Sequence, residues 1–199
     1  MASANVDSGK VREFKDAESF YRWLSKHHDK ESEIWIKIHK VDSGLKSITP
    51  KDAIDVALCW GWIDAVRKSL DNKSYLQRYT PRTKKSTWSQ INVENVARLI
   101  KEGRMTKHGL KQVEAAKSDG RWERAYQSPK DMKIPVDLQA ALDAEPEAKR
   151  MLEKLSAQNR FALAFRLHHM KTEAGRKKKI ETFVNMLKRG ETIYPQGKK

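Results

Sequence analysis

Cysteine is almost absent from this chain, whose 199 residues include only Cys59. A single cysteine excludes an intrachain disulfide and a cluster of thiolates around a metal. Long apolar runs are also missing: no window approaches 18 uninterrupted apolar residues, which argues against a transmembrane helix and against membrane insertion. The first residues, MASANVDSGKVREF, lack the apolar stretch of a signal peptide, so we expect a cytoplasmic location.

The short motifs that mark common catalytic and cofactor sites are missing too. The sequence contains no HExxH, no GxSxG and no glycine-rich phosphate loop. His27/His28 and His168/His169 are adjacent pairs on expected helices, where neighbouring side chains diverge by about 100° and do not readily share a metal. We therefore expect no metal and no cofactor. Cys59 lies late in an apolar helix, which favours an inert core thiol over a nucleophile.

Positive charge is in clear excess. The chain has 41 Lys and Arg against 26 Asp and Glu, a net charge of +15. Residues 67–104 hold ten Lys/Arg against three Asp/Glu, and residues 166–199 also hold ten against three. A basic chain is attracted to nucleic acid, to acidic proteins and to anionic lipid surfaces. No RNA-recognition signature, GxxG clamp or zinc-finger spacing selects one of these partners.

The apolar periodicity predicts an α+β domain over residues 14–88. DAESFYRWLSKHH and TPKDAIDVALCWG have helical spacing, whereas SEIWIKIHKV alternates as a strand with one buried face does. After Gly61 the period becomes two, and WIDAVRKSL and YLQRYTPR flank the turn-rich DNKS. We therefore expect a small antiparallel sheet with flanking helices in the N-terminal half.

The C-terminal half is predicted to be all-helical. Residues 89–128 are expected to form connecting helices, and residues 129–135, with two prolines, a linker. Four short helical patterns follow in residues 136–190. The two ends, residues 1–13 and 191–199, are polar and are expected to be flexible.

Several separated motifs resemble one family in their order. They are ALCWGWIDAVRKSLD, YLQRYTPR, WSQINVENVARLIKEGRM and the tail LSAQNRFALAFRLHHMKTEAGRKKKIETFVNMLKRG. From about residue 14 to 190 the chain resembles the YdeI/OmpD-associated family, also labelled bacteriocin-protection proteins, and the tail resembles its helical C-terminal module. The resemblance implies a link to envelope stress and to resistance against cationic peptides. It implies no catalytic residue.

Three arginines of the predicted hairpin form the main candidate site, for an anion. If Leu70 pairs with Tyr75 across the turn, Arg67 lies directly opposite Arg78, with Arg82 on the same face. Opposed like charges are destabilising by about 0.2–1 kcal/mol, and a phosphate or carboxylate held by the arginine forks would remove this conflict. The alternative is that the arginines point apart into water or pair with acids. A slip of one residue in the hairpin would remove the argument.

A second basic patch lies at the start of the last predicted helix. It consists of Arg176, Lys177, Lys178 and Lys179. Such a run can contact phosphates without reading sequence, but it is also typical of a solvated helix face.

The preferred hypothesis is a non-enzymatic, stress-linked binding protein that recognises a polyanion, nucleic acid above all. Arg67, Arg78 and Arg82 would supply its primary contacts. One alternative is a small anionic-ligand site between the hairpin and the helices, enzymatic or not, with Asp64 as the best candidate acid. Another is a protein-interaction module for an acidic partner. The sequence does not indicate the oligomeric state.

Overall fold

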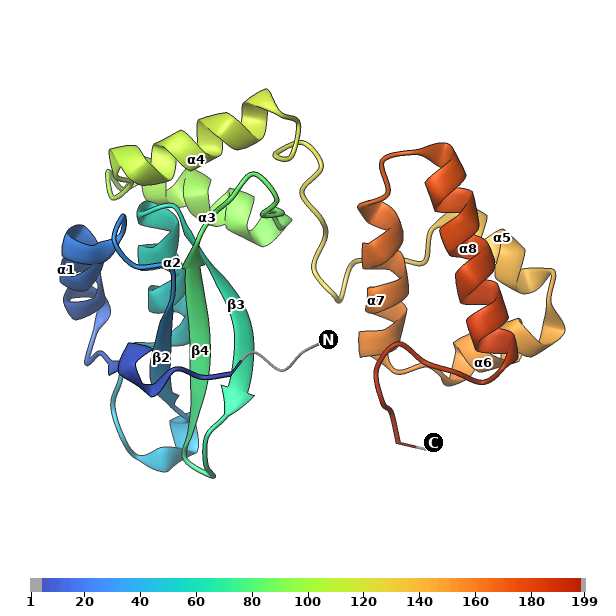
Figure 1. Ribbon diagram of the computed structural model, residues 1–199, viewed down its shortest axis with the longest axis horizontal. Coiled ribbons are helices and arrows are strands. Elements are labelled where there is room, and N and C mark those ends of the chain that lie inside the picture. Colours follow the sequence, from blue (N-terminus) through green and yellow to red (C-terminus); the bar gives the residue numbers. More distant parts are fainter. Residues whose placement is uncertain (1–4, 198–199) are drawn as a thin grey trace. The chain divides into compact units, whose positions relative to one another are not determined.

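The computed structural model describes residues 5–197 and divides into two compact units, residues 1–125 and 126–199 (Figure 1). Residues 1–4 and 198–199, which belong to the two segments predicted to be flexible, lie outside the described residues. None of the helices within residues 5–197 is long and apolar enough to span a bilayer.

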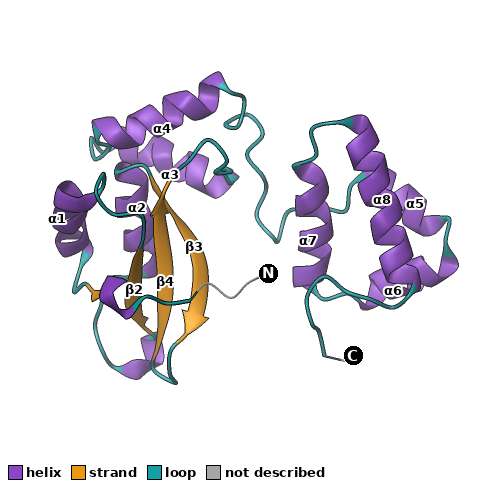
Figure 2. Cartoon of the chain, viewed as in Figure 1, coloured by secondary structure: helices purple, strands orange, loops and turns teal. Residues whose placement is uncertain are grey.

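The first unit is built on a four-stranded sheet with the order β1-β2-β4-β3 (Figure 2). Its strands are β1 (Val11–Glu13), β2 (Ile34–His39), β3 (Trp62–Ser69) and β4 (Ser74–Pro81). β2 pairs with β4 and β4 with β3 in antiparallel fashion, as expected, but β1 pairs with β2 in parallel. The prediction of an antiparallel sheet is therefore wrong, and the sheet is mixed. A helix follows β1 and returns the chain for β2, and such crossovers make parallel pairs.

The helices of this unit each begin directly after a residue whose side chain caps the first turn. α1 (Ala17–His27) starts after Asp16, whose carboxylate accepts a hydrogen bond from the N–H of Ser19 at 2.8 Å. Thr49 caps α2 (Pro50–Cys59) in the same way, and Ser89 caps α3 (Gln90–Lys101). α4 (Lys107–Ser118) follows Thr106. Two short 3-10 helices, Ser8–Lys10 and Val41–Ser43, complete the unit.

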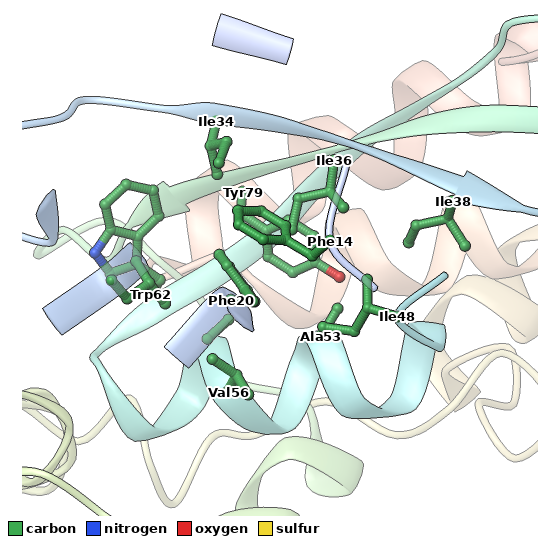
Figure 3. Close-up of a cluster of buried hydrophobic side chains, with 12 residues drawn as sticks. Phe14, Phe20, Ile34, Ile36, Ile38, Ile48, Ala53, Val56, Trp62 and Tyr79 are labelled. Carbon is green, nitrogen blue, oxygen red and sulfur yellow. The ribbon is translucent and has the colours of Figure 1, made fainter. Parts of the chain in front are cut away.

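One face of the sheet carries the main core (Figure 3). Ile34, Ile36 and Ile38 point from β2 toward Phe20 of α1 and Val56 of α2, and each of the five is at most 1% exposed. The predicted alternation of β2 is thus confirmed for its isoleucines. Helices α1 and α2 cover this face because their apolar side chains complete its core.

A second core lies between α2, α3 and α4. It includes Leu58, Val96, Leu99 and Val113. α4 approaches α2 so closely that a Cβ at Gly109 would lie 2.4 Å from the carbonyl oxygen of Cys59. This contact fixes the end of α2 against the start of α4.

The second unit contains four helices. They are α5 (Val136–Asp143), α6 (Pro146–Lys154), α7 (Ala157–His168) and α8 (Glu173–Lys188). Leu138, Leu152, Leu163 and Phe183 form its core, one residue from each helix. Helices thus lie in both halves of the chain, but residues 119–135 and 189–197 contain none, so the C-terminal half is helical only in part.

The segment after α8 is held by the side chains of Asn159 and Gln196. Asn159 is 1% exposed, and its Nδ2 donates to the carbonyl oxygen of Tyr194 at 3.0 Å and to Oε1 of Gln196 at 2.9 Å. Its Oδ1 accepts from the N–H of Tyr194 at 2.9 Å. Gln196 adds two bonds of its own, since its Oε1 accepts from the N–H of Ser156 at 2.9 Å and its Nε2 donates to the carbonyl oxygen of Lys154 at 3.1 Å.

Candidate functional site

The register of the β3–β4 hairpin differs from the predicted one. Ser69, not Leu70, pairs with Tyr75, and an irregularity between Asp64 and Arg67 shifts the pairing by one further residue. Arg67 consequently lies opposite Gln77, so the predicted opposition of Arg67 and Arg78 is wrong. The cause is the turn: the carboxylate of Asp71 accepts hydrogen bonds from the N–H groups of Lys73 and Ser74 at 2.7 and 2.6 Å.

Arg67 and Arg78 lie on opposite faces of the sheet. Directly paired residues share a face, and Gln77, the partner of Arg67, is also paired with Ile36 of the core face. Arg78 is paired with Trp35, which points to the other face. The like-charge conflict on which the anion site was argued therefore does not arise.

Each of these two arginines has a partner within the chain. Arg78 donates from Nε to Oε2 of Glu33 at 2.6 Å and also forms an ion pair with this carboxylate through Nη2. Arg67 donates from Nε to Oε1 of Gln77 at 3.0 Å, and its guanidinium lies 4.3 Å from the ring centroid of Tyr75. Arg67 is nevertheless exposed, whereas Arg78 is half-buried.

Arg82 is a buried structural residue. It is 5% exposed, and its guanidinium lies 3.5 Å from the ring centroid of Trp88, the distance of a close cation–π contact. Its Nη1 donates to the carbonyl oxygen of Thr87 at 3.1 Å. The three predicted arginines thus do not form one cluster, and anion binding by them stays a prediction.

Asp64, the candidate acid, lies half-buried in β3. Burial raises its pKa, and the charges of Arg82 and Arg67 oppose this rise. A carboxyl with a raised pKa beside two arginines has the electrostatics of a functional acid, and its charge adds to the burial that raises the pKa of Tyr79, its partner on β4.

The second predicted patch separates into paired and unpaired cations. Arg176 binds Asp137 through two hydrogen bonds, Nε to Oδ2 at 2.6 Å and Nη2 to Oδ1 at 2.9 Å. Lys177 and Lys178 are exposed and lie within 4.0 Å of no carboxylate among residues 5–197. Lys179 lies 5.8 Å from the ring centroid of Phe183.

A feature that sequence reasoning missed is a polar hollow beside α1. It measures about 260 Å³ and is lined by Ala17, Glu18, Tyr21, Val56, Gly103 and Arg104. Beneath its rim lies an ion-pair network, in which Arg98 Nη2 contacts both oxygens of buried Asp55 at 2.6 and 2.7 Å. Arg104 Nη1 donates to Oε2 of Glu102 at 3.1 Å and lies 3.8 Å from Oδ2 of Asp55.

Two histidines that the sequence placed apart meet near this hollow. The rings of His28 and His108 have centroids 4.0 Å apart, and Trp60 lies beside both. Burial lowers the pKa of His108, and the neighbouring His28 and Lys107 lower it further. Tyr21 completes the row, since its ring centroid lies 5.3 Å from that of Trp60.

The side chains that could bind a metal and the single thiol have the following arrangement in the described residues. Among residues 5–197 no three His, Cys, Asp or Glu side chains gather so that they could hold a metal ion. Cys59 is 1% exposed, and burial raises its pKa to about 11, so at neutral pH it is a protonated, enclosed thiol.

The fold and its surface define a basic protein of two units, an α+β unit followed by a helical unit without any recognisable catalytic constellation in the described residues. Residues 12–112, about half of the chain, match the model of a domain of unknown function (DUF8412), so the chain belongs to this family. Residues 131–190 match the family described as Bacteriocin-protection, YdeI or OmpD-Associated, which confirms the predicted resemblance of the tail. No curated protein and no solved structure gives a significant match.

Proposed function

We propose that the chain is a non-enzymatic binding protein for a polyanion, with nucleic acid as the first candidate. The observation that carries the proposal is that adjacent exposed lysines stand together without acidic partners, Lys84 and Lys85 in the first unit and Lys177 and Lys178 in the second. No carboxylate among residues 5–197 lies within 4.0 Å of their ammonium groups. Such cations remain available to phosphates, whereas Arg78 and Arg176 are already engaged.

Both units carry excess positive charge. Residues 1–125 hold 25 Lys and Arg against 17 Asp and Glu, and residues 126–199 hold 16 against 9. Each unit therefore attracts a polyanion, and the release of counterions on binding would supply most of the affinity.

The loop that presents Lys84 and Lys85 is held in place by its own contacts. Arg121 donates from Nη1 to the carbonyl oxygen of Ser86 at 2.9 Å, and the N–H of Thr83 donates to Oγ of Ser86 at 2.9 Å. A loop that is already ordered loses less conformational entropy on binding. Of the three predicted arginines, exposed Arg67 fits this surface best.

The test is fluorescence anisotropy of labelled single- and double-stranded oligonucleotides titrated across salt. Lys84→Ala/Lys85→Ala should weaken binding to all sequences and reduce the magnitude of the log–log salt slope by about 2, since each lost phosphate contact removes about 0.9 on B-DNA. The control is Lys46→Ala/Lys51→Ala. It removes the same charge from two exposed lysines that are not adjacent to each other and lie near the start of α2.

Equal effects of the two double variants would refute a specific role of the loop, and binding absent at low salt would refute the proposal as a whole. The proposal includes a cytoplasmic, stress-linked setting. The name of the family that residues 131–190 match, which speaks of bacteriocin protection, supports the link to stress.

A further inference from the structure

The polar hollow beside α1 has the features of a binding site distinct from the lysine surface. It lies wholly in the first unit, between α1, α2 and the loop after α3, and measures about 260 Å³. Pockets for drug-sized ligands measure roughly 300–1,000 Å³. The hollow is therefore too small for a nucleotide chain and fits a single small molecule.

One side of this hollow offers an open arginine fork. Arg104 uses Nη1 for Glu102 and Asp55, whereas its Nε and Nη2 make no hydrogen bond with any residue that the structure describes. These two donors form one planar edge, the edge that binds a carboxylate through two parallel hydrogen bonds. The Arg98–Asp55 pair beneath holds Arg104 in place, since buried Asp55 contacts both arginines.

The other side offers a negative charge. Glu18 is exposed and lines the hollow one helical turn before Tyr21. Its one ion pair, to Nε of Arg22 at 3.4 Å, joins two side chains that are 69% and 64% exposed. Such a surface pair is weak, so a ligand cation can compete for the carboxylate.

Between the two charges the wall is apolar and aromatic. Ala17 and Tyr21 line it, Val56 borders it but is only 1% exposed, and the ring centroid of Trp60 lies 5.3 Å from that of Tyr21. One positive and one negative group on the lining make it neutral overall, which disfavours a phosphate dianion and favours a molecule that carries both charges.

We propose that this hollow binds a small zwitterion, an α-amino acid with an apolar or aromatic side chain. The carboxylate would bind the Nε–Nη2 edge of Arg104 and the ammonium group would bind Glu18, while the side chain packs on Tyr21 and Ala17. This activity is independent of nucleic-acid binding, because it uses none of the four lysines.

The test uses the full-length, ¹⁵N-labelled chain and three probes at millimolar concentration: L-phenylalanine, 3-phenylpropionate, which lacks the ammonium group, and 2-phenylethylamine, which lacks the carboxylate. L-phenylalanine should shift the amide signals of residues 17–21 and 103–104 and the indole signal of Trp60. It should bind about tenfold or more tightly than either truncated probe, because each lost charge removes a charge-assisted hydrogen bond.

Two variants and one control separate binding from folding. Arg104→Gln should weaken L-phenylalanine and 3-phenylpropionate alike, whereas Glu18→Gln should weaken L-phenylalanine and leave 3-phenylpropionate unchanged or tighter. Arg22→Gln, which frees Glu18, should bind L-phenylalanine at least as well as the unaltered chain. The proposal is overturned if L-phenylalanine shifts no signal around the hollow, if the three probes bind equally, or if Glu18→Gln weakens all of them.

Discussion

Replacing Arg98 by Met removes the main partner of a buried carboxylate. The side chain of Asp55 is 3% exposed, whereas that of Arg98 is 35% exposed. Breaking a buried ion pair by removing one partner is destabilising by about 3–5 kcal/mol, because the remaining charge stays desolvated. Arg104, at 3.8 Å from Asp55, compensates in part. We therefore expect Arg98→Met to lower the free energy of unfolding by about 3 kcal/mol.

Substitution of the other member of the pair, Asp55, should lower the free energy of unfolding less. Asp55→Asn keeps the shape of the side chain and one acceptor, and it leaves the charge on Arg98, which water reaches and which Glu102 still contacts at 3.1 Å. We expect a loss of about 1–2 kcal/mol, that of a weakened hydrogen-bonded pair. The pair should thus show a clear asymmetry: removal of the exposed partner destabilises more than neutralisation of the buried one.

Tryptophan fluorescence during urea unfolding measures this asymmetry in the right unit. All six tryptophans lie within residues 1–125, so the signal reports the first unit alone. Arg22→Met is the matched control, because its pair with Glu18 is exposed and should contribute no more than about 1 kcal/mol. If Arg98→Met were no more destabilising than Arg22→Met, or less than Asp55→Asn, the reasoning from burial would be refuted.

Four further outcomes are expected. Because burial raises the pKa of Asp64, the folded state holds this proton more tightly than the unfolded chain, and stability falls as pH rises through the unfolded value of about 3.9 toward the folded one. Asp64→Asn should remove this fall and raise the melting temperature at pH 7. Hydrogen bonding to Arg176 lowers the pKa of Asp137, so this pair stabilises above the unfolded pKa and is lost as pH falls through the folded one. Arg176→Gln should therefore weaken the acid dependence of unfolding of the second unit, followed by circular dichroism. Asn159→Ala should destabilise that unit by about 1–3 kcal/mol, since it leaves half-buried partners unsatisfied, and hydrogen exchange should become fast at the amide of Tyr194. Cys59 should resist alkylation by iodoacetamide in the native protein and react promptly in urea.

The elements of the first unit could be predicted from the sequence because their signals are local. Asp16, Thr49 and Ser89 mark helix starts through a hydrogen bond to a residue three positions ahead. The alternation of Ile34 and Ile36 follows from the period of a strand. β1 could not be found in this way, because three residues give no period and its partner β2 lies beyond a helix.

The candidate site could not be predicted because it depends on long-range pairing. The hairpin register follows from the turn, where Asp71 bonds to two N–H groups, and from the irregularity after Asp64. The turn places Arg67 opposite Gln77, so Arg67 and Arg78 separate onto two faces, and the irregularity shifts residues 62–64 by one further position. The hollow is formed by Tyr21 and Arg104, which are distant in sequence. The only local feature of the sequence that pointed to this hollow was the position of Tyr21 beside the apolar stripe of α1.

The most direct test of polyanion binding is the salt dependence of oligonucleotide affinity for a fourfold variant. It replaces by alanine two pairs of adjacent exposed lysines that have no acidic partner among residues 5–197: Lys84 with Lys85, and Lys177 with Lys178. If these side chains contact phosphates, the variant should bind every sequence more weakly, and its log–log salt slope on duplex DNA should be smaller in magnitude by about 3.6. An unchanged slope in a correctly folded variant would contradict the proposal that these lysines contact phosphates. The net charge of +15 would then not act through these four positions.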